Sequence, residues 1–192
     1  MAIVSRIRAL WRHLPPGGRL LFFDVQPVTV KAYGGQRYTS AHHLVLGPHQ
    51  KTRGRFYLFL AYDLASGKVH WAFLPGKDST KVCHFMRRVR RGYPRSEIWV
   101  ALDRDSSHPH KSRLTRRTMR QLHLHYLSLP KGCPDDNPVE TLFSPVQTMI
   151  LNSSNDPDAG TTRRRISAYL RGHNRRDDRQ IQISYLPDTH KH

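Results

Sequence analysis

The spacing of the apolar residues changes at Pro75-Gly76, and this change limits the possible folds more than any other feature of the chain. Before it, compact apolar runs are bounded by turn residues, as is typical of strands. After it, apolar side chains recur at helical spacing and alternate with short apolar runs. This order predicts an α/β fold in which a mixed sheet is flanked by helices. The predicted strands cover 20–23, 55–64, 69–74, 98–102 and 124–129.

The predicted helices lie mostly after this change. The first begins after Asp78 or Ser79 and ends near Gly92, because its apolar residues recur at i, i+3, i+4 and i+7. A later helix begins near Val139, and Pro145 inside it should kink the helix or end it early. The predicted helices cover 6–13, 79–91, 112–122, 139–150 and 162–170.

These elements divide the chain into three parts. Residues 1–19 form a short basic N-terminal segment, residues 20–151 form the main α/β domain, and residues 152–192 form a basic C-terminal helix and tail. Two hairpins are expected, one turning at Gly34-Gly35 and one at 65–68.

Positive charge is the dominant feature of the composition. The chain has 32 Lys and Arg against 14 Asp and Glu, a formal charge of +18. Because such an excess destabilises a lone compact domain by self-repulsion, we expect phosphate contacts, with solvated helix faces as the alternative. The predicted DNA-binding residues are Lys111, Arg113, Arg116, Arg117, Arg120, Arg163, Arg164 and Arg165.

Several classes of protein are excluded by what the sequence lacks. No apolar stretch approaches the roughly 20 residues that a membrane-spanning helix needs. The start of the chain has no small-residue cleavage site of a signal peptide. Two cysteines, Cys83 and Cys133, are too few for a disulfide framework or a Cys-rich zinc site. We therefore expect a soluble, cytoplasmic protein without a membrane partner.

Three acids lie beside segments that should be buried. Asp24 follows the first apolar strand, Asp103 follows the fourth, and Glu140 lies in the first turn of an amphipathic helix. A carboxylate in such a place is costly unless it is paired or binds a metal. Hard oxygen ligands favour Mg²⁺ or Mn²⁺, and three carboxylates can hold two such ions for phosphodiester chemistry.

Each acid also has a structural interpretation. Asp24 could end its strand at a turn, and Asp105 could replace Asp103 as the ligand. If Asn137 is the helix N-cap, Glu140 is its reciprocal partner in a capping box. The spacing of the residues leaves these alternatives open.

The acidic motifs resemble those of DDE transposases, most closely the mariner-like superfamily that includes bacterial insertion-sequence transposases. The resemblance spans about Leu20 to Leu151, and 36 residues, 104 to 139, lie between the second and third acids. The matching motifs are Leu21-Phe22-Phe23-Asp24, Leu102-Asp103 with His108 five residues later, and Asp135-Asp136-Asn137-Pro138-Val139-Glu140. The chain departs from the usual pattern at Val25, Arg104 and Phe143.

This resemblance implies a ribonuclease-H-like fold and a metal-binding, catalytic triad of Asp24, Asp103 and Glu140. It implies that two Mg²⁺ or Mn²⁺ ions support cleavage at a transposon end, after which the freed 3′-hydroxyl attacks target DNA. His108 matches an accessory position that orients a phosphate or a carboxylate, with a simple turn histidine as the alternative. A homodimer on DNA, in bacterial cytoplasm and associated with the nucleoid, is also implied.

Relatives in this superfamily carry helix-turn-helix domains before the catalytic domain, whereas only 19 residues precede Leu20 here. We expect either a separately encoded N-terminal recognition domain or a truncated copy. Two other functions stay open at this point. One is an inactive, DNA-binding transposase remnant, and the other is a metal-dependent nuclease or resolvase on the same fold.

Overall fold

A computed structural model describes residues 2–31, 51–129, 137–152 and 154–176. The predicted hairpin at Gly34-Gly35 and Cys133 lie outside these residues. Its elements in chain order are α1 (Ala2–Arg12), β1 (Arg19–Val30), β2 (Gly54–Asp63), β3 (Val69–Leu74), α2 (Ser79–Gly92), β4 (Ile98–Leu102), α3 (Arg113–Gln121), β5 (Leu124–Ser128), α4 (Val139–Pro145), the π-helix η2 (Val146–Leu151) and α5 (Ala159–Arg175).

The strands form one mixed sheet in the order β3-β2-β1-β4-β5. The first three strands pair antiparallel, and β2 and β3 form the predicted hairpin. Strands β4 and β5 join on the other side of β1, both parallel to it. The crossover from β4 to β5 passes through α3, as a parallel pair requires. The predicted mixed sheet flanked by helices is confirmed.

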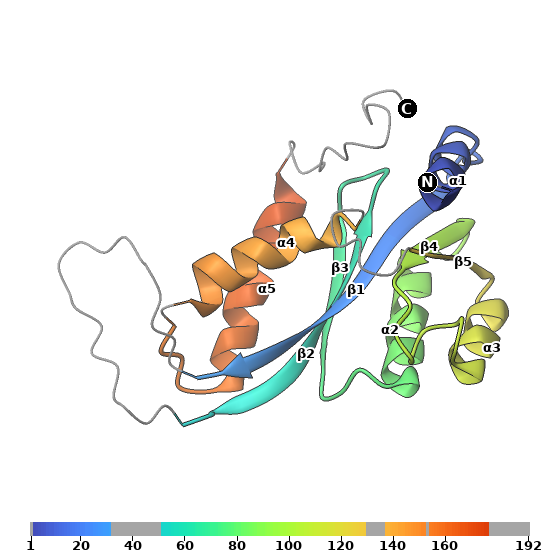
Figure 1. Ribbon diagram of the computed structural model, residues 1–192. Coiled ribbons are helices and arrows are strands. Elements are labelled where there is room, and N and C mark those ends of the chain that lie inside the picture. Colours follow the sequence, from blue (N-terminus) through green and yellow to red (C-terminus); the bar gives the residue numbers. More distant parts are fainter. Residues whose placement is uncertain (1, 32–50, 130–136, 153, 177–192) are drawn as a thin grey trace.

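Helices cover both faces of the sheet (Figure 1). On one face, α1, α4, η2 and α5 pack against a core that includes Phe22, Leu58 and Leu60. On the other face, α2 packs through Phe85 and Val89, two of the residues that set its predicted periodicity. The first acid-bearing strand, β1, lies in the middle of the sheet, between these two layers.

Strand β1 is longer than predicted, which corrects the position of Asp24. The prediction ends this strand at Asp24, but β1 continues to Val30 because β2 pairs with it over its whole later half. Pro27 is tolerated there because β4 stops pairing after Phe23, so one edge of β1 needs no N–H donor. Asp24 therefore lies within a strand and not at a turn.

The predicted break at Pro145 is present in the helix that begins at Val139. Pro145 ends α4 as an α-helix, and the chain continues as the π-helix η2. Proline lacks an N–H and crowds the preceding turn, so the break occurs where the sequence predicts it. No described helix is long and apolar enough to span a membrane.

The ends of the described chain pack into the same core as the sheet. Ile7 and Trp11 of α1 are buried in it, as are Ile166 and Leu170 of α5. Helix α5 is longer than predicted, and Asp158 caps it by accepting from the Thr161 N–H. The division at 19/20 and 151/152 stays a prediction, but both flanking helices contribute to one hydrophobic core.

Candidate active site

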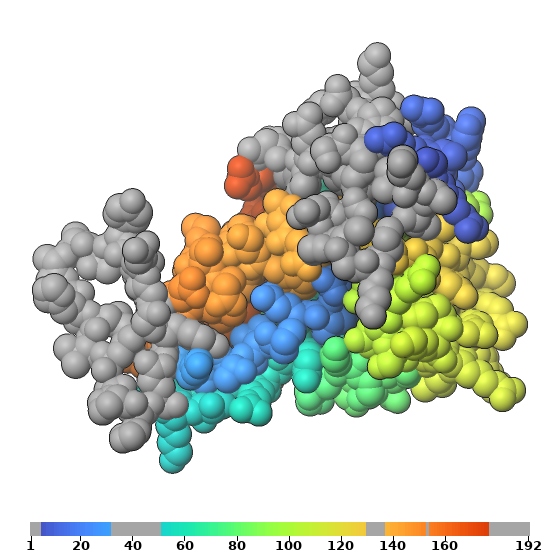
Figure 2. All heavy atoms as spheres, in the orientation of Figure 1, coloured from blue at the N-terminus to red at the C-terminus, as the bar shows by residue number. Residues whose placement is uncertain are grey.

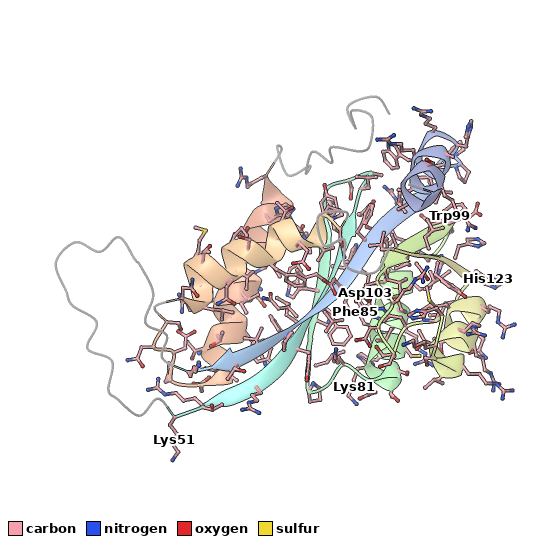
Figure 3. All side chains as sticks on the ribbon, viewed as in Figure 1. Lys51, Lys81, Phe85, Trp99, Asp103 and His123 are labelled. Carbon is pink, nitrogen blue, oxygen red and sulfur yellow. The ribbon has the colours of Figure 1, made fainter. Side chains whose placement is uncertain are left out.

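Strand register brings the first two acids next to each other. Strands β1 and β4 run parallel, and their last paired residues are Phe23 and Leu102. Asp24 and Asp103 each follow directly after these last paired residues, so they lie side by side where the pairing of β1 with β4 ends. Figure 3 shows Asp103 beside the middle of β1. The Asp103 side chain is 53 % exposed, whereas Asp24 is partly buried.

The third acid is brought in by the start of α4. Asn137 Nδ2 donates to the Phe23 carbonyl at 3.5 Å, which ties the residues before α4 to the strand that carries Asp24. Val139 is fully buried in the core beneath them. Glu140, in the first turn of α4, lies near enough to Asp24 for its charge to raise the pKa of the Asp24 carboxyl. The three acids therefore converge from β1, the end of β4 and α4.

This convergence makes the site electrostatically unfavourable for three negative charges. Burial raises the pKa of Asp24 to about 7, and the charges of Asp103 and Glu140 add to the rise. The Val25 N–H donates to Asp24 Oδ1 at 2.7 Å and acts in the opposite direction. Among the described residues, neither Asp24 nor Glu140 forms an ion pair with a basic side chain. A cluster of this kind favours a bound cation.

His108 is held directly against Asp103. Its Nδ1 lies 2.6 Å from Asp103 Oδ1 and 3.0 Å from the Asp103 carbonyl oxygen. The imidazole is only 3 % exposed and packs near the Phe23 ring, with centroids 5.5 Å apart. Burial lowers the pKa of His108, but its hydrogen bonds to Asp103 and the Asp103 charge raise it further than burial lowers it. The same bond lowers the pKa of Asp103.

Asp105 accepts hydrogen bonds within the turn before α3. It accepts from the Ser107 N–H at 2.9 Å, from the Ser107 hydroxyl at 2.8 Å and from Lys77 Nζ at 2.9 Å. Burial raises the pKa of Asp105, but these donors together lower it well below its usual range. Its carboxylate is thus satisfied within the protein, which favours Asp103 over Asp105 as the metal ligand.

The capping-box interpretation of Glu140 is wrong. The N-cap residue of α4 is Pro138, and no hydrogen bond among the described residues joins the Glu140 side chain to the Asn137 N–H, as a capping box requires. Asn137 Oδ1 accepts from the Val139 N–H at 3.3 Å, while its amide nitrogen reaches β1. The sequence does not predict the hydrogen bond from Asn137 to the Phe23 carbonyl. Its local pattern indicates a helix cap, and the partner is 114 residues away.

The predicted DNA-binding residues divide into two groups. Arg163 stacks over the Phe56 ring at 4.8 Å, Arg165 pairs with Asp156 at 2.8 Å, and Arg116 donates to the Pro109 carbonyl at 2.9 Å. These three side chains already have partners within the protein. Arg164 also has a partner, because its Nη2 donates to the Thr161 hydroxyl at 2.8 Å. Lys111, Arg113, Arg117 and Arg120 form the second group and are exposed.

The donor chemistry of the acidic cluster fits a hard divalent cation. Its side chains offer only carboxylate oxygens, the ligands that Mg²⁺ and Mn²⁺ prefer. Within residues 2–31, 51–129, 137–152 and 154–176, no three His, Cys, Asp or Glu side chains lie close enough together to hold a metal ion. The negative charges of Asp103 and Glu140 both raise the pKa of Asp24, and a cation between the carboxylates would oppose that effect.

The sheet order and the origin of the three acids define the class of protein. The sheet is mixed, with three antiparallel strands and two parallel ones. The acids lie on its first strand, after its fourth and on the helix that follows its fifth. This is the ribonuclease-H-like arrangement. The DDE superfamily endonuclease family matches residues 19–163, and the chain belongs to this family. No curated protein matches the chain.

Solved structures confirm the fold. The Mos1 transposase paired-end complex with left transposon end matches with a TM-score of 0.64 and 16 % identity, covering 93 % of this chain and 54 % of that one. The catalytic domain of Mos1 mariner transposase matches with a TM-score of 0.63 and 14 % identity, covering 93 % and 80 %. A simian T-cell lymphotropic virus intasome gives 0.57 and 11 %, covering 84 % and 49 %. This chain spans about half the length of the Mos1 chain in the paired-end complex.

Proposed function

We propose that this chain is the catalytic domain of a mariner-like DDE transposase that cleaves a DNA strand at a transposon end and joins the freed 3′-hydroxyl to target DNA. The observation that carries the proposal is the convergence of Asp24, Asp103 and Glu140, in which burial raises the pKa of Asp24 to about 7 and the charges of the other two acids add to the rise. Family membership supplies the reaction class, endonuclease. Strand transfer is supported by the fold shared with a transposase.

The catalytic residues of the proposal are the three acids. Asp24, Asp103 and Glu140 would hold two Mg²⁺ or Mn²⁺ ions. When bound, such ions activate a water or 3′-hydroxyl and stabilise the leaving oxygen of a phosphodiester. Structures of Mos1 paired-end complexes with Mg and with Mn share this fold and support the choice of metal.

The other residues of the site bind and orient. His108 keeps the Asp103 carboxylate in one orientation through its 2.6 Å contact, and it acts as a positioning residue. Exposed basic side chains hold DNA phosphates, among them Lys111 and Arg113 in the segment where α3 begins. Arg163, Arg164 and Arg165 have intramolecular partners and contribute less to DNA binding than Arg117 and Arg120 do.

The proposed partners are transposon ends and target DNA. The chain would act as a homodimer on DNA, because two ends have to be brought together, and a separately encoded domain would recognise the end sequence. Because phosphate contacts carry no sequence information, this domain alone would bind DNA with little sequence preference. Its place would be the cytoplasm of a bacterium, on the nucleoid.

A nicking assay tests the catalytic part of the proposal. Supercoiled plasmid is incubated with Mg²⁺ or Mn²⁺ and either this chain or its Glu140→Gln variant. We expect metal-dependent nicking by the parent chain and none by the variant. Nicking that persists in Glu140→Gln would remove Glu140 from the site, and the absence of nicking by the parent would contradict catalysis by this chain.

A joining assay separates a transposase from a nuclease. A pre-cleaved duplex with a labelled 3′-hydroxyl end is mixed with unlabelled plasmid under the same conditions. We expect label to become covalently attached to the plasmid. Nicking without joined product would assign the chain to the nuclease or resolvase class.

A further inference from the structure

Helices α2 and α3 form one continuous outer surface on their face of the sheet. Two contacts pair them in the same direction: Cys83 Sγ with Thr115 Oγ1 at 3.9 Å, and Arg90 Nη2 with the His123 carbonyl at 2.8 Å. The helices therefore run parallel, starting near the acids and ending at the opposite end of β4. Figure 2 shows their green and yellow surfaces as one exposed region.

The outward side of this region is basic along its whole length. Neither helix contains an acid, because their sequences are STKVCHFMRRVRRG and RLTRRTMRQ. In the described parts of the chain, none of the outward arginines forms an ion pair. Side chains with nitrogen ends project outward from α3 in Figure 3. The α2–α3 face consists of His84, Arg87, Arg91, Arg113, Arg117 and Arg120, all exposed.

The regular placement of these cations follows from the helix period. Arg87 and Arg91, and likewise Arg113, Arg117 and Arg120, recur every three or four residues, so each row repeats at about one 5.4 Å turn. Packed helices lie about 8–10 Å apart, so the two rows form a band of fixed width. Their opposite sides are buried through Phe85 and Met119, which holds the rows rigidly on the sheet.

The side chains of the α2–α3 face indicate which kind of ligand it binds. The face offers no Phe, Tyr or Trp side chain on which an unstacked base could rest, and the exposed large apolar residue at its border is Leu114. A second copy of the same face would be repelled by like charge. A rigid polyanion with regularly spaced phosphates matches two rows of arginines, and duplex DNA is such a polyanion.

We propose that the α2–α3 face binds the phosphate backbone of the duplex that extends away from the reacting strand. The face starts beside the acidic cluster, since α3 follows the turn held by Asp105 and Ser107. It then runs along the layer opposite α4, which carries Glu140 (Figure 1). The inference rests on the proposed function, and it adds α2 to the DNA-binding surface and assigns duplex backbone as its ligand.

The test compares two variants with the same net charge. The face variant carries Arg87→Gln, Arg91→Gln, Arg117→Gln and Arg120→Gln. The control variant changes four exposed arginines of the other layer, Arg6, Arg12, Arg171 and Arg175, to Gln. Binding to a fluorescent 30-base-pair duplex is measured by anisotropy, without metal, over a range of salt concentrations. Thermal unfolding confirms that each variant is folded.

For the face variant, the slope of log K against log salt should fall in magnitude by about 3 to 4, at roughly 0.9 per lost phosphate contact. For the control variant it should change by less than about 1. Equal changes in both variants would overturn the inference, because net charge alone would then explain binding. An equally large loss on a single strand of the same length would overturn the assignment to duplex.

This measurement is separable from the proposed function. It needs no cleavage, so DNA binding by the α2–α3 face can be measured even if the parent chain does not nick plasmid. Conversely, unchanged binding by the face variant together with normal nicking would reject the face and leave catalysis intact.

Discussion

Two acids on neighbouring strands of this sheet have opposite surroundings. Asp63, at the end of β2, is fully buried, yet it accepts from the Ala65 N–H at 3.0 Å, the Ser66 hydroxyl at 2.7 Å and the Tyr93 hydroxyl at 2.8 Å. Asp24 is less buried, but its neighbours are two more acids. Burial alone therefore does not mark a functional acid. The two acids differ in their donors, because Asp24 accepts a single hydrogen bond within the described residues, from the Val25 N–H.

The Asp63 cluster joins several elements at the end of the sheet away from the acids. Arg19 lies 3.5 Å from the Asp63 carboxylate, and Tyr93 also contacts His70 Nε2 at 2.7 Å. Burial and the Asp63 charge raise the pKa of Tyr93 well above its usual range, so the phenol stays a donor. This cluster closes the turn after β2 and anchors the end of α2. The contacts of this cluster stabilise the fold, whereas the acids near Asp24 raise the pKa of its carboxyl.

The largest expected effect comes from Asp24→Asn, the sharpest test of this contrast. Removing one of three clustered charges should abolish metal-dependent nicking while the midpoint of thermal unfolding stays equal or rises. The physical reason is that the amide relieves repulsion but cannot serve as an anionic metal ligand. A lowered unfolding temperature would mean that Asp24, like Asp63, stabilises the fold.

Asp63→Ala should show the reverse behaviour. Three donors would lose their acceptor in a buried site, so we expect the free energy of unfolding to fall by roughly 3 kcal/mol. Urea unfolding measures this loss. Nicking per folded molecule, assayed at low temperature, should stay within a few-fold of the parent, and its complete loss in folded protein would contradict a purely structural role.

His108→Ala should reduce cleavage by about 10- to 100-fold, the usual effect of losing a side chain that orients a metal ligand. The metal concentration for half-maximal nicking should rise, because Asp103 becomes free to rotate. In His108→Asn, the amide nitrogen can take the place of Nδ1. This variant should recover part of the cleavage rate and part of the apparent metal affinity. His110→Ala is the matched control, and an equal effect in it would point to general damage of the turn.

The smallest effect is expected for Asp105→Ala. This residue accepts from Ser107 and Lys77 in a partly exposed turn, so its loss should cost about 1 kcal/mol of stability. Nicking should change by no more than a few-fold. A loss as complete as that of Asp24→Asn would make Asp105, and not Asp103, the acid of the second position.

Much of the fold follows from local sequence patterns. The periodicity that changes at Pro75-Gly76 locates the β2–β3 hairpin, β4, β5 and the buried stripe of α2. Asp78 and Ser112 cap α2 and α3 as short polar residues before helices usually do. The acidic motifs and their spacing supply the candidate triad. These features need only nearby residues, since helix and strand periods are properties of a few turns or pairs.

Only the tertiary structure decides which side chains meet. The sequence places Asp24 at a strand end, but the length of β2 carries β1 onward to Val30. Likewise, the sequence gives no reason to separate Arg163 and Arg165 from Arg117. In the structure, Arg163 stacks over the Phe56 ring and Arg165 pairs with Asp156. Strand register, packing between helices and the pairing of charges all depend on residues far apart in the chain. A local pattern contains no information about those distant partners.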